Sequence, residues 1–118
     1  SNQYCYRAHC YATTRLIAAK LGLKPEQYSI SFQSRLGRTP WIQPFTDVVV
    51  PNLAKSGVKR LAVVCPSFVT DCLETLEEIG MRARESFIES GGSEFKAIPC
   101  LNTNQTWINA IIQIAHNL

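Results

Sequence analysis

The sequence predicts an α/β fold in which a parallel β-sheet is sandwiched by helices, as in open Rossmann-type sheets. Helical and strand-like patterns alternate along the chain, which is typical of parallel strands joined by right-handed helical crossovers. One strand-like run, Arg60–Cys65, is almost continuously apolar, as expected for a strand buried on both faces of a parallel sheet. The 118 residues can close one compact core but not two, so residues 1–118 are taken as a single domain.

Seven elements follow one another, and each has its own signal in the sequence. We expect helices over residues 4–21, 46–55, 71–90 and 104–116, and strands over residues 28–32, 60–65 and 95–98. Apolar and small residues recur at helical spacing in the first helix, which Gly22 ends. Strand-forming residues alternate in the first strand, and Thr46 or Asp47 caps the second helix. Proline and glycine exclude both helix and strand from the long loop between these two elements.

The second half of the chain carries the clearest helical pattern. Pro66-Ser67 ends the apolar strand, and a helix then runs to the Gly91-Gly92 pair. The apolar side chains of this helix fall three and four positions apart, which predicts a stripe that faces the core. The stripe consists of Leu73, Leu76, Ile79, Ala83 and Phe87. A strand and a last helix follow the glycine pair.

Composition and charge exclude several classes of protein. Twelve basic and nine acidic residues give a net charge of +3, which is too mild and too evenly spread for a nucleic-acid surface. No stretch approaches the roughly 20 apolar residues needed to cross a bilayer, so we expect a soluble domain with at most peripheral membrane contact. Five cysteines without a C-x-x-C pair indicate neither a disulfide framework nor a zinc site, which fits a reducing cytoplasm. The sequence also lacks a glycine-rich phosphate fingerprint, so nucleotide binding is not expected.

The start of the chain indicates a piece of a larger protein. The sequence opens with Ser1-Asn2 rather than methionine, and helical periodicity begins almost at once. This combination is typical of a shortened protein that follows a few residues left from an expression tag, here residues 1–2. We therefore expect only part of the functional machinery in this chain.

Carboxylates gather on the side of the 71–90 helix that lies opposite its apolar stripe. Asp71, Glu74 and Glu78 lie in the first two turns, at the end of the sheet where a ligand would bind. Neighbouring carboxylates raise one another's pKa and together favour cations or shared protons, so this group could pass protons or hold a divalent metal. The alternative is a solvated helix face whose early acidic residues the helix dipole favours. Glu85 and Glu89 are assigned to such a face.

The loop after the first strand carries a basic pair and an indole. Arg35 and Arg38 flank Gly37, and Trp41 follows Pro40. A flat anionic ligand suits such a loop, because guanidinium groups pair with carboxylates in a forked geometry and an indole packs against a planar ring. Alternatively, Trp41 plugs the edge of the domain and the arginines face water.

The residues of both segments occur in a specific order along the chain. The ordered string is Gln33-Ser34-Arg35, Gly37, Pro40-Trp41, Pro44, Thr46-Asp47, Cys65-Pro66, Asp71, Leu73-Glu74-Thr75-Leu76-Glu77-Glu78 and Leu101-Asn102. From about Tyr4 to the C-terminus, the chain resembles ferrochelatases. The resemblance implies the chelatase-like C-terminal lobe of a two-lobed enzyme, a lyase that inserts ferrous iron into protoporphyrin or coproporphyrin in haem biosynthesis.

The resemblance also implies roles for individual residues. Glu74 matches the family's metal-site and proton-handling glutamate, and Asp71 and Glu78 match the acidic path behind it. Four further residues match the family's loop that lines the porphyrin cleft, namely Gln33, Ser34, Arg35 and Trp41. Cys72 stands where other members carry histidine. These residue types suit iron insertion, because the reaction removes pyrrole protons and strips water from a divalent cation, and so requires bases and hard oxygen ligands.

Two departures from the family pattern limit what this chain is expected to do alone. The family's catalytic histidine belongs to a segment upstream of this chain, and His9 does not match its surroundings. We therefore expect the isolated chain to be inactive and to need the N-terminal lobe, whose contact surface would otherwise drive self-association. The cysteine cluster that holds an iron–sulfur centre in some members has no counterpart here, so no tightly bound cofactor is expected.

Two other functions remain open at this point. A cobalt or sirohydrochlorin chelatase shares the fold and the chemistry, but such enzymes normally place paired histidines in the cleft. A catalytically silent α/β module would bind a tetrapyrrole or pack against a partner lobe.

Overall fold

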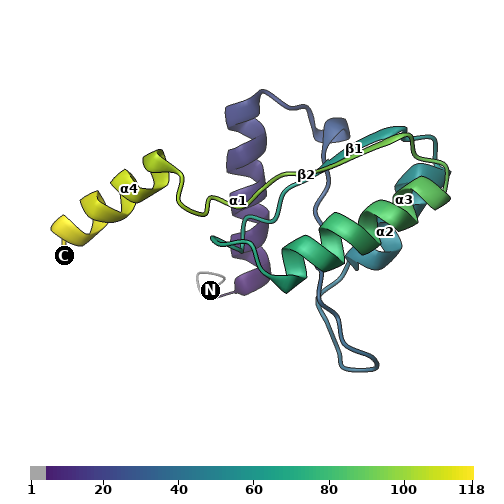
Figure 1. The fold of residues 1–118 in the computed structure, drawn as a ribbon, viewed down its shortest axis with the longest axis horizontal. Helices are drawn as coiled ribbons and strands as arrows, with labels where there is room; N and C mark the ends of the chain where they lie inside the picture. Colours follow the sequence, from purple (N-terminus) through teal and green to yellow (C-terminus); the bar gives the residue numbers. More distant parts are fainter. Residues whose placement is uncertain (1–4) are drawn as a thin grey trace.

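The computed structural model describes residues 5–118 and confirms the α/β class with a parallel sheet (Figure 1). The elements are helices α1 (Tyr6–Leu21), α2 (Thr46–Lys55), α3 (Arg84–Glu89) and α4 (Gln105–His116), the 3-10 helix η1 (Pro25–Gln27), the π-helix η2 (Glu74–Ala83) and strands β1 (Arg60–Val63) and β2 (Glu94–Ala97). The expected start of the first helix at Tyr4 and the Ser1-Asn2 remnant lie outside the described residues. Gly22 ends α1 as predicted, in a left-handed conformation with φ of 69°.

The sheet pairs β1 with β2 in parallel, with Leu61 opposite Phe95. The predicted strand over residues 28–32 is wrong, because this segment forms only a single bridge between Phe32 and Phe45. The Phe32 N–H donates to the Pro44 carbonyl (2.9 Å), and the Thr46 N–H donates to the Phe32 carbonyl (3.0 Å). A strand needs ladder partners along its length, and within residues 5–118 the backbone of this segment pairs only with the end of its own loop.

The core lies where α2, η2 and α3 meet β2. Its buried side chains are Val50, Ala54, Ile79, Phe87 and Phe95. The Phe87 and Phe95 rings have centroids 6.0 Å apart, and Phe87 is fully buried. Gly92 has to be glycine because a side-chain carbon there would overlap the Phe87 ring. The glycine pair read from the sequence as a helix stop therefore also packs against the core.

The helix expected over residues 71–90 begins only at Leu73 and is π-helical over Glu74–Ala83, which changes the side chains that face inward. Leu73 and Leu76 were expected in the core stripe, but they are 71% and 59% exposed. The inward-facing side chains instead recur every four residues, as Thr75, Ile79, Ala83 and Phe87. A π-helix closes each hydrogen bond one residue later than an α-helix, so its turn is wider and the inward face recurs at a longer spacing. The Arg84 N–H, for example, donates to the Ile79 carbonyl.

Two parts of the chain have little packing around them. Strand β1 was expected to be buried on both faces, but Ala62 and Val64 are exposed and only the alternate residues are partly covered. Helix α4 extends away from the body (Figure 1), with Ile111, Ile112 and Ile114 exposed. Within residues 5–118, no helix is both long and apolar enough to cross a membrane.

Candidate active site

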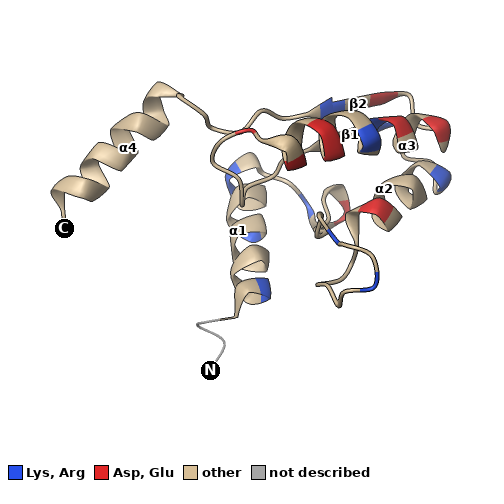
Figure 2. Ribbon diagram, turned by 60° about the horizontal axis from the view of Figure 1, so that its bottom comes forward, with Lys and Arg blue, Asp and Glu red and all other residues tan. Residues whose placement is uncertain are grey.

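A cavity of about 530 Å³ lies between the loop after Phe32, helix α2 and the π-helix. Figure 2 shows acidic residues along the helical run of η2 and α3, and basic residues on the loop that precedes α2. Five of the predicted site residues line this cavity, namely Gln33, Ser34, Arg35, Glu74 and Glu78. The structure therefore brings the loop and part of the acidic helix together around one concavity.

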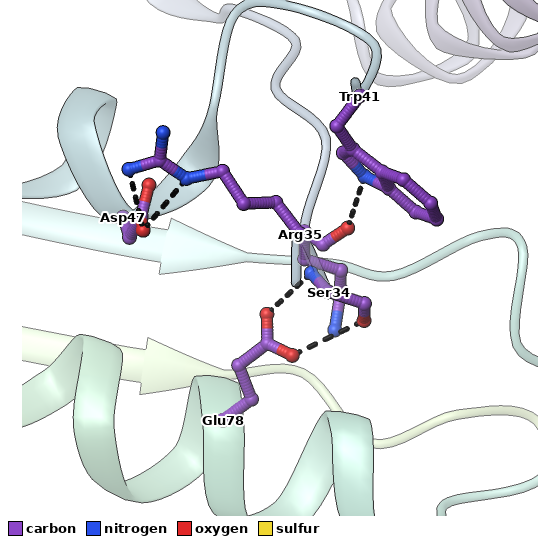
Figure 3. A network of polar contacts seen from close by, with 6 residues as sticks. Ser34, Arg35, Trp41, Asp47 and Glu78 are labelled. Atoms are coloured by element: carbon purple, nitrogen blue, oxygen red, sulfur yellow. Dashed lines mark hydrogen bonds and ion pairs between the residues drawn. The ribbon is translucent and has the colours of Figure 1, made fainter. Parts of the chain in front are cut away.

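The loop is attached directly to the π-helix by two consecutive residues, the second of which, Ser34, lies against Glu78 in Figure 3. The Gln33 side-chain amide donates to the Glu74 carbonyl (2.8 Å). The Ser34 N–H and hydroxyl both donate to the Glu78 carboxylate, at 2.7 Å and 3.1 Å. Ser34 adopts a left-handed conformation, with φ of 67°, which is uncommon for a residue with a side chain. These contacts hold the loop in one position along the acidic helix.

One basic and one aromatic side chain of the loop, Arg35 and Trp41, are held by protein partners. The Arg35 guanidinium donates to Asp47 Oδ2 through Nε (3.2 Å) and Nη2 (3.0 Å), and it lies 4.2 Å from the centre of the Phe45 ring. The Trp41 indole N–H donates to the Gln33 carbonyl (2.8 Å). This bond fixes the direction of the indole, although Trp41 is not among the residues that line the cavity. About two fifths of Trp41 is exposed, so it does not plug the edge of the domain.

Glu74 presents an ionised carboxylate to the cavity. Its pKa is lowered mainly by a hydrogen bond from the Cys72 side chain and secondarily by a backbone hydrogen bond. We expected neighbouring carboxylates to raise one another's pKa, and that expectation is wrong for Glu74 and Asp71. Hydrogen bonds to the charged form outweigh the opposing effect of desolvation at both residues. A charged oxygen ligand at Glu74 suits a divalent cation.

Asp71 lies in a different environment from Glu74 and does not line the cavity. Its carboxylate accepts hydrogen bonds from the Asn102 amide (2.8 Å), the Thr75 hydroxyl (2.8 Å) and the Cys100 N–H (3.2 Å). The Asp71 N–H in turn donates to the Asn102 side-chain oxygen (2.9 Å). The hydrogen bond from Asn102 contributes most to lowering the Asp71 pKa. Asp71 thus connects the segment after β1 to the segment after β2.

Thiols lie near this end of the helix, but they do not form a metal centre. Burial raises the pKa of Cys65 to about 11, and it also raises the pKa of Cys100. Both thiols therefore stay protonated at neutral pH and are poor metal ligands. Among the described residues, no three histidine, cysteine, aspartate or glutamate side chains are arranged to hold a metal ion. Glu74 as a metal ligand remains a prediction.

Comparison with known proteins identifies the family. Residues 1–118 match the family model described as Ferrochelatase. The chain belongs to the ferrochelatase family. It is 56% identical to the ferrochelatase of Coxiella burnetii (strain Dugway 5J108-111) over 98% of its length, and 54% identical to that of Stutzerimonas stutzeri (strain A1501) over 93%. It spans about a third of these relatives, 32% in each case, so it corresponds to one part of a ferrochelatase.

Two residues of this site were not predicted from the sequence. Thr75 was read only as part of the family motif, yet its hydroxyl connects the Asp71 carboxylate to the Cys72 N–H (3.0 Å). Its spacing of four from Ile79 was the available signal, because both side chains lie on the inward face of the helix. Asp47 was read as a possible helix cap and as part of the family motif, but α2 has no side-chain cap, and no local pattern indicated that Asp47 would pair with Arg35.

Proposed function

We propose that this chain is the C-terminal part of an enzyme that inserts ferrous iron into a porphyrin during haem biosynthesis. The observation that carries the proposal is the Glu74 carboxylate, which is kept ionised on a cavity whose opposite wall is the loop bearing Ser34 and Arg35. Membership in the ferrochelatase family supports the same reaction. The enzyme would be a lyase of the cytoplasm, with at most peripheral attachment to a membrane.

The carboxylates of the π-helix would bind the metal and transfer the protons that the reaction releases. Iron insertion exchanges the pyrrole protons of the macrocycle for a dehydrated divalent cation, so the site needs both a base and hard oxygen ligands. Glu74 would provide an oxygen ligand for iron and accept a proton, and Glu78 would lie on the path by which protons leave. We propose that Asp71 supports this wall, because three hydrogen-bond donors already surround its carboxylate.

The loop would hold the edge of the porphyrin. Protoporphyrin and coproporphyrin both carry propionate carboxylates, which match the donors of Ser34 and the guanidinium of Arg35. The Trp41 ring, held through its N–H, has faces on which a flat macrocycle can pack. Gln33 would link substrate binding to the helix, because its side chain reaches the Glu74 backbone.

The rest of the enzyme would complete the site. The two histidines of the chain, His9 and His116, do not line the cavity, and the resemblance places the catalytic histidine in the preceding part of the protein. We therefore propose that the isolated chain is inactive, that the N-terminal lobe is its natural partner, and that the chain self-associates without it. The proposal requires neither an iron–sulfur cluster nor a nucleic acid.

Metal insertion by the intact protein tests the proposal. Ferrous iron and cobalt would each be supplied anaerobically with protoporphyrin, coproporphyrin and sirohydrochlorin, and insertion followed by absorbance. We expect iron insertion into one of the first two macrocycles, with no turnover by the isolated chain. Insertion of cobalt into sirohydrochlorin alone would support the related chelatase instead, and porphyrin binding without turnover would indicate a silent module.

A further inference from the structure

Ser34 has the geometry of a small carboxylate-binding position. Its backbone N–H and its hydroxyl point at the two oxygens of one carboxylate, at 2.7 Å and 3.1 Å (Figure 3). Ser34 makes both bonds from a left-handed backbone conformation, with φ of 67°. Two donors that converge on one carboxylate recognise that group wherever it comes from, whether from a protein side chain or from a ligand.

The protein itself provides the carboxylates that are bound on this loop. Glu78 occupies the donors of Ser34, and Asp47 occupies the guanidinium of the next residue, Arg35. Under the proposed function, these same two residues face the propionates of a porphyrin. A propionate and a glutamate side chain end in the same group, so a bound propionate can compete with Glu78 for the same donors.

We propose that Glu78 is an internal stand-in for a substrate carboxylate, which holds the donors of Ser34 until a porphyrin propionate takes its place. This inference rests on the proposed function. In addition to its place on the acidic path, Glu78 here occupies the substrate-binding donors before the porphyrin binds. Porphyrin binding at Ser34 then displaces the Glu78 side chain from the loop. The exchange conserves hydrogen bonds, because one carboxylate replaces another on the same N–H and hydroxyl.

The displaced carboxylate is well placed to join Glu74. Side chains four residues apart share one face of this π-helix, as Thr75 and Ile79 do on the inward side. Glu74 and Glu78 are also four apart, and both line the cavity. Porphyrin binding therefore places the Glu78 carboxylate beside Glu74 as a second charged oxygen ligand or base. Without a bound macrocycle, Glu78 stays on the donors of Ser34. Glu78 acts as a positioning residue before binding and becomes available for the reaction afterwards.

Porphyrin binding by the intact protein tests the inference, with a dicarboxylate porphyrin and its dimethyl ester as probes. Glu78→Gln removes the competing charge while keeping the size of the side chain. We expect it to tighten the dissociation constant of the dicarboxylate by about three- to tenfold, as for the loss of a competing charge-assisted contact, and to leave the ester unchanged. The same variant lowers KM and kcat together, because substrate binds more readily but the freed carboxylate is missing.

Control variants separate this exchange from loss of structure. Glu85→Gln alters an exposed carboxylate of α3, for which we expect no change with either porphyrin. Glu78→Asp keeps the charge on a shorter side chain that reaches the two donors poorly, so an intermediate tightening is expected if Glu78→Gln does not fold. Melting temperatures of all variants confirm that folded proteins are compared.

Two distinct results would overturn the inference. Weaker binding of the dicarboxylate by Glu78→Gln would show that Glu78 preforms the loop rather than competing with the substrate. Equal changes for the acid and the ester would show that Ser34 does not bind a propionate. Failure of the wild-type protein to bind either porphyrin or to insert iron would instead refute the proposed function on which the inference rests.

Discussion

The two ends of the acidic segment, at Asp71 and at Glu74–Glu78, both carry carboxylates, but these carboxylates have different surroundings. Asp71 accepts hydrogen bonds from three partners and connects the segments that follow the two strands. Glu74 and Glu78 line the cavity, where their contacts are to the loop or to a single thiol. Carboxylates that look like one row in the sequence therefore divide between one that connects two segments of the fold and two that line the cavity. The following predictions test that division.

Glu74→Gln is expected to have the largest effect, and on activity alone. Loss of a group that transfers protons in the transition state lowers rates about 10²- to 10⁴-fold, and we expect iron insertion by the intact protein to fall by that amount. The melting temperature should change little, because the carboxylate bridges no two segments. Glu85→Gln serves as the control. A normal insertion rate in Glu74→Gln would remove Glu74 from the mechanism.

Thr75→Val is expected to have the next largest effect, and on stability. Thr75 is 6% exposed, and its hydroxyl connects Asp71 to the Cys72 N–H. Valine has the same shape without the hydroxyl, so it removes the partner of the half-buried Cys72 N–H and one of the bonds to Asp71, at a cost of about 1–3 kcal/mol. Urea unfolding would measure the free-energy difference, and Thr13→Val on the exposed side of α1 would be the control. Equal stability of the two variants would contradict a supporting role for this end.

Acid should weaken the Asp71 end before it affects the core. The native-state pKa of Asp71 lies below its ordinary value of 3.8, so this carboxylate contributes stability above pH 3.8. That contribution is lost as pH falls below 3.8 and through the lower native-state pKa. Unfolding free energies measured across this range should therefore fall less steeply in Asp71→Asn than in the wild type. Parallel curves for the two proteins would show that Asp71 is not coupled to folding.

Asp47→Asn is expected to have the smallest effect on stability. Its ion pair with Arg35 is largely open to solvent, with side-chain exposures of 63% and 34%, and such pairs contribute about 0–1 kcal/mol. The change releases the Arg35 guanidinium, so binding of a dicarboxylate porphyrin should be retained or tightened. Unfolding and porphyrin titration measure the two effects. A large loss of stability would mean that Asp47 stabilises the fold, as Asp71 does.

Elements with local signals could be predicted from the sequence, whereas those that depend on distant partners could not. Helix α4 begins one residue after the predicted position because Asn104 caps it, accepting from the Trp107 N–H (3.2 Å). The strand expected at residues 28–32 does not form, because a strand requires a neighbour that no local pattern reveals. The exposed Leu73 was misplaced because the helical spacing rule assumes α-helical turns.

The candidate site divides in the same way. Motif order indicated Ser34 and Glu74, which the structure brings to one cavity. Motif order also grouped Asp71 with them. It could not reveal that Asp71 is bound elsewhere, because the hydrogen-bond partners Cys100 and Asn102 lie about thirty residues further along the chain. Their contact follows from the parallel pairing of β1 with β2, and the spacing of residues along one helix carries no information about it.

The most direct test is the rate of ferrous iron insertion per folded molecule, compared between Glu74→Gln and Asp71→Asn in the intact protein. Both variants would be assayed well below their melting temperatures. We expect Asp71→Asn to keep most of the wild-type rate despite its lower stability, and Glu74→Gln to lose at least about 100-fold at nearly wild-type stability. Equal losses in the two folded variants would show that the carboxylates act as one row and would contradict the division proposed here.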